Sequence, residues 1–164
     1  MDVLLSIKPK YVDAILSGEK KYEFRKIIFK NKNIRNIYMY STSPTKRIVG
    51  SFTMRNIICD SPENLWEKFR DYSGLNDKDF FYYFGKREKG FAIEIGIIKR
   101  FEIPIDPKVA IPGFRPPLSF YYLYRDLEIE GEGIAIRKND PIFYKTSCDL
   151  SEGFSRQEHI SKYF

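Results

Sequence analysis

One short stretch of the sequence carries the clearest structural signals: Ser17-Gly18-Glu19-Lys20-Lys21-Tyr22-Glu23-Phe24-Arg25-Lys26. The apolar residues before it have helical spacing, and Gly18 is a typical C-cap at which such a helix ends. From there on polar and apolar residues alternate, which predicts a strand over residues 21–27. Alternation assigns the side chains to two faces: Lys21, Glu23 and Arg25 on one, Tyr22 and Phe24 on the other.

The rest of the chain supplies further short strands and a few helices. Strands are predicted over residues 2–7, 34–41, 47–58, 90–101 and 121–124, and helices over 9–17, 61–72 and 77–84. Most of the strands are joined by short turns, whereas a parallel sheet needs a helical crossover between most pairs. The pattern therefore favours an α+β fold: a curved, partly closed antiparallel β-barrel with flanking helices.

The length of 164 residues fits one domain with a sizeable core. We expect residues 1–125 to form this domain. Residues 126–164 are expected to be a C-terminal extension packed on the same domain, with strands or mixed elements at 127–130 and 134–137.

Composition restricts the class of protein. The net charge is +6, from 28 Lys and Arg against 22 Asp and Glu, so an anionic partner is plausible. The sequence shows no signal peptide and no apolar run of the roughly 18 residues that span a bilayer, and we expect a cytoplasmic protein without a membrane partner. Two cysteines, Cys59 and Cys148, are expected to be reduced thiols, and the single histidine, His159, does not suggest a zinc site. No metal or cofactor is expected.

Two polar clusters could carry chemistry. The predicted face with Lys21, Glu23 and Arg25 is either a solvated sheet surface or the lining of a concavity, in which the cations would bind phosphate. Ser41 and Thr42, at the end of a predicted strand, either cap a turn or contact a phosphate or a base.

The stretch of residues 17–26 also resembles the signature of the ASCH domain family, Gly-x-Lys-x-x-Glu-x-Arg. The signature residues are here Gly18, Lys20, Glu23 and Arg25. The resemblance covers roughly residues 3–124. Its later parts are Tyr40-Ser41-Thr42-Ser43-Pro44, Ile48-Val49-Gly50-Ser51-Phe52, Ala92-Ile93-Glu94-Ile95 and Pro116-Pro117-Leu118-Ser119-Phe120. Leu118 stands where some relatives have glutamine.

The resemblance implies a fold of the PUA-like superfamily and a basic cleft lined by the signature. It also implies RNA binding or nucleic-acid binding, with a role in transcription or translation regulation. The ligand-binding residues expected from the two polar clusters and the resemblance are Lys20, Lys21, Glu23, Arg25, Ser41, Thr42 and Ser119.

Some branches of the family are similar to enzymes. One branch acts on acetylated cytidine with a lysine and a threonine nucleophile. Those positions are Lys20 and Glu23 here, so the nucleophile is replaced. Another branch is associated with ribonuclease activity. We expect a binding module rather than an enzyme; if it is an enzyme, Lys20 and Glu23 are the catalytic candidates.

Three hypotheses follow. The first is a module that holds a base or a strand of nucleic acid, with single-stranded RNA as the expected partner. The second is a hydrolase acting on RNA or on a modified nucleoside, and the third is a small-ligand or protein-interaction domain. Under the first, Glu23→Ala and Arg25→Ala should impair binding with little change in melting temperature.

The aromatic run Phe80–Phe84 should mostly pack in the core, with one ring exposed near Lys86 and Arg87. This exposed ring could stack on a base.

Overall fold

The computed structural model describes residues 1–31, 33–123, 129–130 and 133–134. The elements are, in chain order, β1 (Asp2–Ile7), α1 (Pro9–Leu16), β2 (Tyr22–Arg25), β3 (Asn36–Ser41), β4 (Arg47–Asp60), α2 (Pro62–Phe69), the 3-10 helix η1 (Arg70–Tyr72), α3 (Asp77–Phe84), β5 (Gly90–Ile105), α4 (Pro107–Ala110), β6 (Phe120–Leu123), β7 (Ile129–Glu130) and β8 (Gly133–Ile134).

Six strands form one mixed sheet in the order β2-β5-β4-β3-β1-β6. All neighbouring pairs are antiparallel except β1 and β3, which run parallel, with Val3 opposite Ile37. The sheet is therefore mixed, and this one pair departs from the expected antiparallel arrangement. The reason is that residues 8–35, with α1 and β2, connect the two strands, and a connection of this length can return the chain in the same direction.

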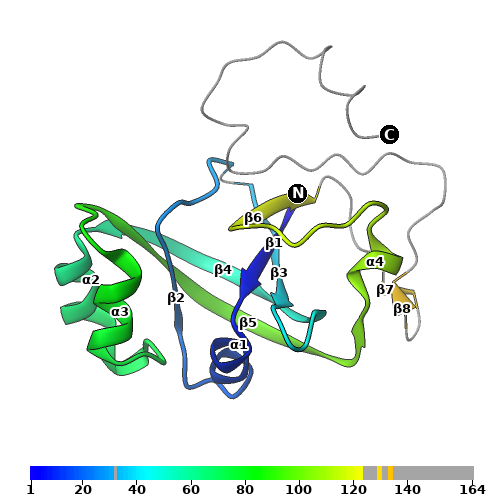
Figure 1. Ribbon diagram of the computed structural model, residues 1–164, viewed down its shortest axis with the longest axis horizontal. Coiled ribbons are helices and arrows are strands. Elements are labelled where there is room, and N and C mark those ends of the chain that lie inside the picture. The colour runs from blue at the N-terminus through cyan, green and yellow to red at the C-terminus, as the bar shows by residue number, and fades with distance from the viewer. Residues whose placement is uncertain (32, 124–128, 131–132, 135–164) are drawn as a thin grey trace, which may run out of the picture.

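The sheet is strongly curled, and β4 and β5 cross it as two long ribbons (Figure 1). The register between them shifts at three places, two of which flank Met54. Such β-bulges increase local twist and bend a strand, so the long hairpin wraps around the core instead of lying flat. The predicted α+β class, with a curved, partly closed sheet and flanking helices, is confirmed.

Three apolar clusters hold the elements together. The largest lies inside the curl and joins β1, β3 and β6 to α1 through residues such as Leu5, Ile15 and Phe120. A second lies on the other face of β1 and β3 and includes Ile111, next to α4. In the third, α2 and α3 pack against β2 and β5, with Phe80 and Phe24 in edge-to-face contact at 5.0 Å between ring centroids.

Helices α1, α2 and α3 begin where the sequence predicts, for simple local reasons. Ser61 and Asn76 cap α2 and α3 by accepting hydrogen bonds from backbone N–H groups, and Pro9 opens α1. Gly18, just after α1, has a φ of +81°. Beyond the strand predicted to end at residue 101, β5 continues to Ile105 and the short helix α4 follows.

Most of the expected C-terminal extension lies outside the described residues. Within it the structure describes β7 and β8, which pair with each other. No helix in the described part of the chain is long and apolar enough to cross a membrane.

Candidate functional site

The signature residues form a buried ionic network beneath the edge strand β2. The Glu23 carboxylate lies between two cations, with its oxygens 3.5 Å from Lys20 Nζ and 3.5 Å from Arg25 Nη1. Only 1% of Lys20, 5% of Glu23 and 7% of Arg25 is exposed to solvent. These charges contact one another and are almost fully buried, so their expected role as direct ligands stays a prediction.

Lys20 anchors the end of α1 and the start of β2 to the turn after η1. Its Nζ donates a 2.6 Å hydrogen bond to the carbonyl of Ser73 and lies 4.9 Å from the centre of the Phe24 ring. Gly74 packs on the stem of this lysine, and a Cβ added there would come within 3.0 Å of Lys20 Cβ. Burial lowers the pKa of Lys20, and the nearby Glu23 carboxylate opposes that shift.

Arg25 connects the two edges of the open sheet, which meet at a seam between β2 and β6. It stands on the edge strand β2, and its Nη2 donates to the backbone carbonyl and the hydroxyl of Ser119, at 2.8 and 2.9 Å, just before the opposite edge strand β6. Its Nη1 donates to the carbonyl of Ser6 in β1 at 3.1 Å. Of the expected site residues, the structure thus joins Lys20, Glu23, Arg25 and Ser119 in one network.

Lys21 separates from that network, contrary to the alternation that placed it with Glu23 and Arg25. It precedes β2 and is exposed, and its Nζ lies 4.5 Å from the centre of the Tyr72 ring. The Lys21 backbone N–H donates a 2.8 Å hydrogen bond to the Tyr72 carbonyl, and the Lys21 carbonyl accepts one from the Ile95 N–H. Lys21 is therefore free to meet an anion at the surface, which its buried neighbour Lys20 is not.

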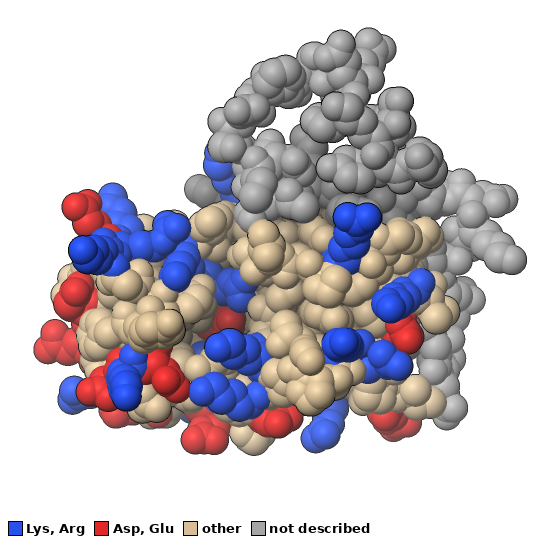
Figure 2. Space-filling model, in the orientation of Figure 1, with Lys and Arg blue, Asp and Glu red and all other residues tan. Residues whose placement is uncertain are grey.

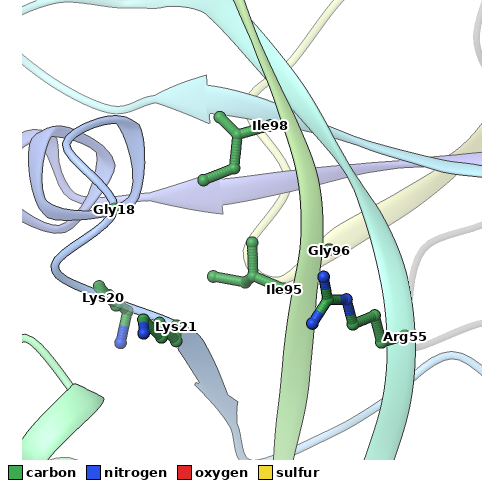
Figure 3. Close-up of a pocket in the computed structure, with 7 residues that line it drawn as sticks. All are labelled: Gly18, Lys20, Lys21, Arg55, Ile95, Gly96 and Ile98. Carbon is green, nitrogen blue, oxygen red and sulfur yellow. The ribbon is translucent and has the colours of Figure 1, made fainter.

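A pocket of about 270 Å³ opens beside Lys21, between the end of α1 and the β4–β5 hairpin. Figure 3 shows Arg55 extending from β4 towards Gly96 on β5, with Ile95 and Ile98 pointing towards the end of α1. The lining residues are Gly18, Lys20, Lys21, Arg55, Ile95, Gly96 and Ile98. The pocket thus combines two exposed cations with an apolar wall, a composition suited to an anionic ligand that also has a flat apolar part.

Arg55 was not among the residues predicted from the sequence. Register shifts on both sides of Met54 bend β4, and Arg55 follows directly. It passes over Gly96, where an added Cβ would overlap Thr53 and come within 3.2 Å of Arg55 Cγ. The one signal in the sequence was a glycine in a strand, which often marks a bulge or a close approach.

Ser41 and Thr42 lie at the end of β3, away from this pocket. Ser41 is buried and pairs with Ile7 of β1, one residue beyond Ser6, and the Thr42 N–H donates to the Ile7 carbonyl at 3.0 Å. Their backbone therefore continues the sheet, and among the described residues no hydrogen bond or ion pair connects their side chains to the ionic network. No group of three or more His, Cys, Asp and Glu side chains in the described ranges could hold a metal ion.

The charged surface around these elements is uneven. Figure 2 shows basic side chains on both sides of the furrow between the α2–α3 lobe and the sheet. Acidic side chains lie mainly at the outer rim of the helical lobe and along the lower edge in this view. A furrow flanked by cations attracts anions, and more strongly at low salt.

The fold and the signature define an ASCH-like domain. The crystal structure of ASCH from Zymomonas mobilis superposes with a TM-score of 0.71 at 27% identity, covering 76% of this chain and 88% of that one. A tyrosine-to-phenylalanine variant of the same protein gives 0.71 at 26% identity, covering 76% and 91%. The chain belongs to the family described as "Domain of unknown function (DUF365)", whose sequence model matches residues 2–113.

Curated proteins are also similar in sequence. The "ASCH domain-containing ribonuclease" of Zymomonas mobilis is 28% identical over 131 residues, which is 76% of this chain and 86% of that protein. "Large ribosomal subunit protein uL22" of Ureaplasma parvum is 28% identical over 92 residues, which is 56% of this chain and 29% of that protein.

Proposed function

We propose that this protein binds RNA, and that a nucleotide of a single strand occupies the pocket between α1 and the β4–β5 hairpin. The observation that carries the proposal is the pair of exposed cations, Lys21 and Arg55, at a pocket with an apolar wall. The relative named as a ribonuclease supports RNA as the anion. The curled sheet is consistent with the PUA-like superfamily, to which we assign the domain.

The pocket offers a separate contact for each part of a nucleotide. Lys21 and Arg55 would hold the phosphate, and the planar guanidinium of Arg55 suits bidentate contact with phosphate oxygens. Ile95 and Ile98 offer apolar surface to a base or ribose. Binding through phosphate releases counterions, so the affinity should fall as salt rises.

The buried network has a positioning role in this proposal. Lys20 fixes the junction that carries Lys21, and Arg25 ties β2 to the opposite edge of the sheet. Glu23 holds both cations in place. The pocket is therefore preformed, which lowers the entropy lost on binding.

The test is fluorescence polarisation with labelled single-stranded RNA at two salt concentrations, followed by a gel of the same samples. We expect Lys21→Ala and Arg55→Ala each to weaken binding and to reduce the slope of log affinity against log salt by about 0.7. Lys108→Ala, an exposed cation on α4, is the matched control. If both site variants bind RNA with the affinity and the salt slope of the control, the pocket is not the RNA site.

A ribonuclease is the second candidate function, because the similar Zymomonas protein carries that name. Burial lowers the pKa of Lys20, and a lysine with a lowered pKa is suited to proton transfer near neutral pH. Its Nζ is enclosed by Glu23, Ser73 and Phe24, so catalysis would require the network to open. Cleavage of the RNA on the gel, lost in Lys20→Met but kept in Lys108→Ala, would favour this function over binding alone.

A further inference from the structure

Helix α3 exposes aromatic rings that the core does not need. Phe80 and Phe84 are buried and supply its contacts with β2 and β5. Phe81, Tyr82 and Tyr83 follow one another at the surface with 38%, 89% and 36% of each residue exposed. A single exposed ring needs no explanation, but three at successive positions of one helix, beside a charged turn, give this end of α3 a distinct composition.

Positive charge lies beside one of these rings, that of Tyr83. The Lys26 N–H donates to the Tyr83 hydroxyl at 3.2 Å, and Lys26 Nζ lies 4.9 Å from the centre of the same ring. Burial raises the pKa of Tyr83, and the charges of Arg25 and Arg87 oppose that shift. We call Tyr82, Tyr83, Lys26, Lys86 and Arg87 the aromatic–basic surface.

The turn that carries these charges is held in place. The Gly85 N–H donates to the Phe81 carbonyl at 2.8 Å, and the Arg87 N–H to the Phe84 carbonyl at 3.3 Å. At the start of β5, a Cβ added to Gly90 would overlap the Phe84 ring. Figure 2 shows basic side chains gathered at the upper left, over the connection from α3 to β5.

The aromatic–basic surface and the pocket lie at opposite ends of β2. At its start Lys21 contacts the ring of Tyr72, and at its end Lys26 contacts the ring of Tyr83. The two lysines are five positions apart in the sequence, which corresponds to roughly 17 Å along an extended chain. Because β2 is an edge strand, the path between the two ends runs along the border of the sheet.

We propose that the aromatic–basic surface is a second contact region for single-stranded RNA, on which an unpaired base stacks against Tyr82 while Lys26, Lys86 and Arg87 contact the backbone. This inference rests on the proposed function, since the same strand would run from the pocket along β2 to α3. Alternating cations and exposed rings are the means by which proteins hold single strands without reading their sequence. The occupant is therefore expected to be RNA, bound with little sequence preference.

The experiment compares two lengths of labelled RNA, a trinucleotide and a twelve-nucleotide strand, on the full chain. Tyr82→Ala should lower the affinity for the longer strand by roughly 5- to 150-fold, the range for loss of one stacked base. The affinity for the trinucleotide should stay unchanged. Tyr82→Phe, which keeps the ring, should retain wild-type affinity. Val109→Ala, which changes an exposed apolar residue on α4, is the control. Because Tyr82 is almost fully exposed, its variants should fold normally.

The outcomes separate this inference from the proposed function. If the wild-type chain binds neither RNA, the proposed function fails and this inference fails with it. If RNA binds but Tyr82→Ala leaves the longer strand unaffected, as it would if a protein used this surface, only the present inference is overturned. Equal losses for both lengths would also overturn it, because Tyr82 would then act through the fold or the pocket.

Discussion

Glu23→Ala tests whether the signature residues support the fold. The substitution removes the carboxylate 3.5 Å from both Lys20 Nζ and Arg25 Nη1, and leaves two buried cations without a counter-charge. Removing one partner of a buried ion pair costs about 3–5 kcal/mol. Lys20 keeps the Ser73 carbonyl, and Arg25 keeps its backbone acceptors, so we expect the lower end of that range, about 3 kcal/mol.

That loss should be plain in a melting curve. For a chain of this size each kcal/mol corresponds to roughly 2–4 °C, so the melting temperature should fall by roughly 6–12 °C. Most single domains have unfolding free energies of about 5–15 kcal/mol, so the variant should still fold at room temperature. This replaces the sequence-based expectation that Glu23→Ala and Arg25→Ala leave the melting temperature almost unchanged.

The assay is thermal and urea unfolding followed by circular dichroism, with Glu19→Ala as the matched control. Glu19 is an exposed carboxylate in the same segment, and its loss should change the free energy of unfolding by less than about 0.5 kcal/mol. The double variant Lys20→Met, Glu23→Gln should lose less than the sum of the single variants, because it removes opposite charges together. If Glu23→Ala has the same melting temperature as Glu19→Ala, the Glu23 carboxylate does not hold the two cations in the folded protein.

Two further predictions concern stability. In urea titrations, Gly74→Ala should lower the free energy of unfolding by more than Gly18→Ala does. Both glycines have a positive φ, which costs alanine about 1–2 kcal/mol. Only at Gly74 would the added Cβ also press on Lys20. Equal losses would mean that the Lys20 contact is unimportant. Burial raises the pKa of Tyr38 to about 12 from 10.0, so the unfolded chain loses this proton first and stability should fall as pH rises through that window. This fall in stability, measured by urea midpoints, should be shallower in Tyr38→Phe. Parallel curves of stability against pH for the wild-type chain and the variant would contradict this.

Much of the fold follows from local patterns in the sequence. Pro9 and Gly18 bracket the first helix, and the long alternating or apolar runs correspond to β4 and β5, because each signal acts within a few residues. The parallel pairing of β1 and β3 depends instead on how 28 intervening residues return the chain, and no local pattern records that. The helix α4 has four residues, too few for a period to be visible.

The candidate site was predictable in its members and not in its geometry. The signature identified Lys20, Glu23 and Arg25, but it did not show that they would bind one another. That depends on Ser73 and Ser119, which are distant in sequence and reach the network only through the tertiary fold. Arg55 was missed for a related reason, since its approach to the pocket depends on bulges in a strand pairing.

The geometry of β2 suggests why buried charges would be kept in a place where apolar residues could pack. Replacing a buried ion pair by well-packed apolar side chains is often neutral or stabilising, so stability alone does not explain the network. The network does what an apolar core cannot: Arg25 makes directional hydrogen bonds to Ser6 and Ser119 across the seam, and Lys20 does so to Ser73. The edge strand is thereby fixed at both ends. Because Lys21 and Lys26 flank that strand, a fixed β2 sets the spacing of the two lysines that we propose contact the same RNA strand.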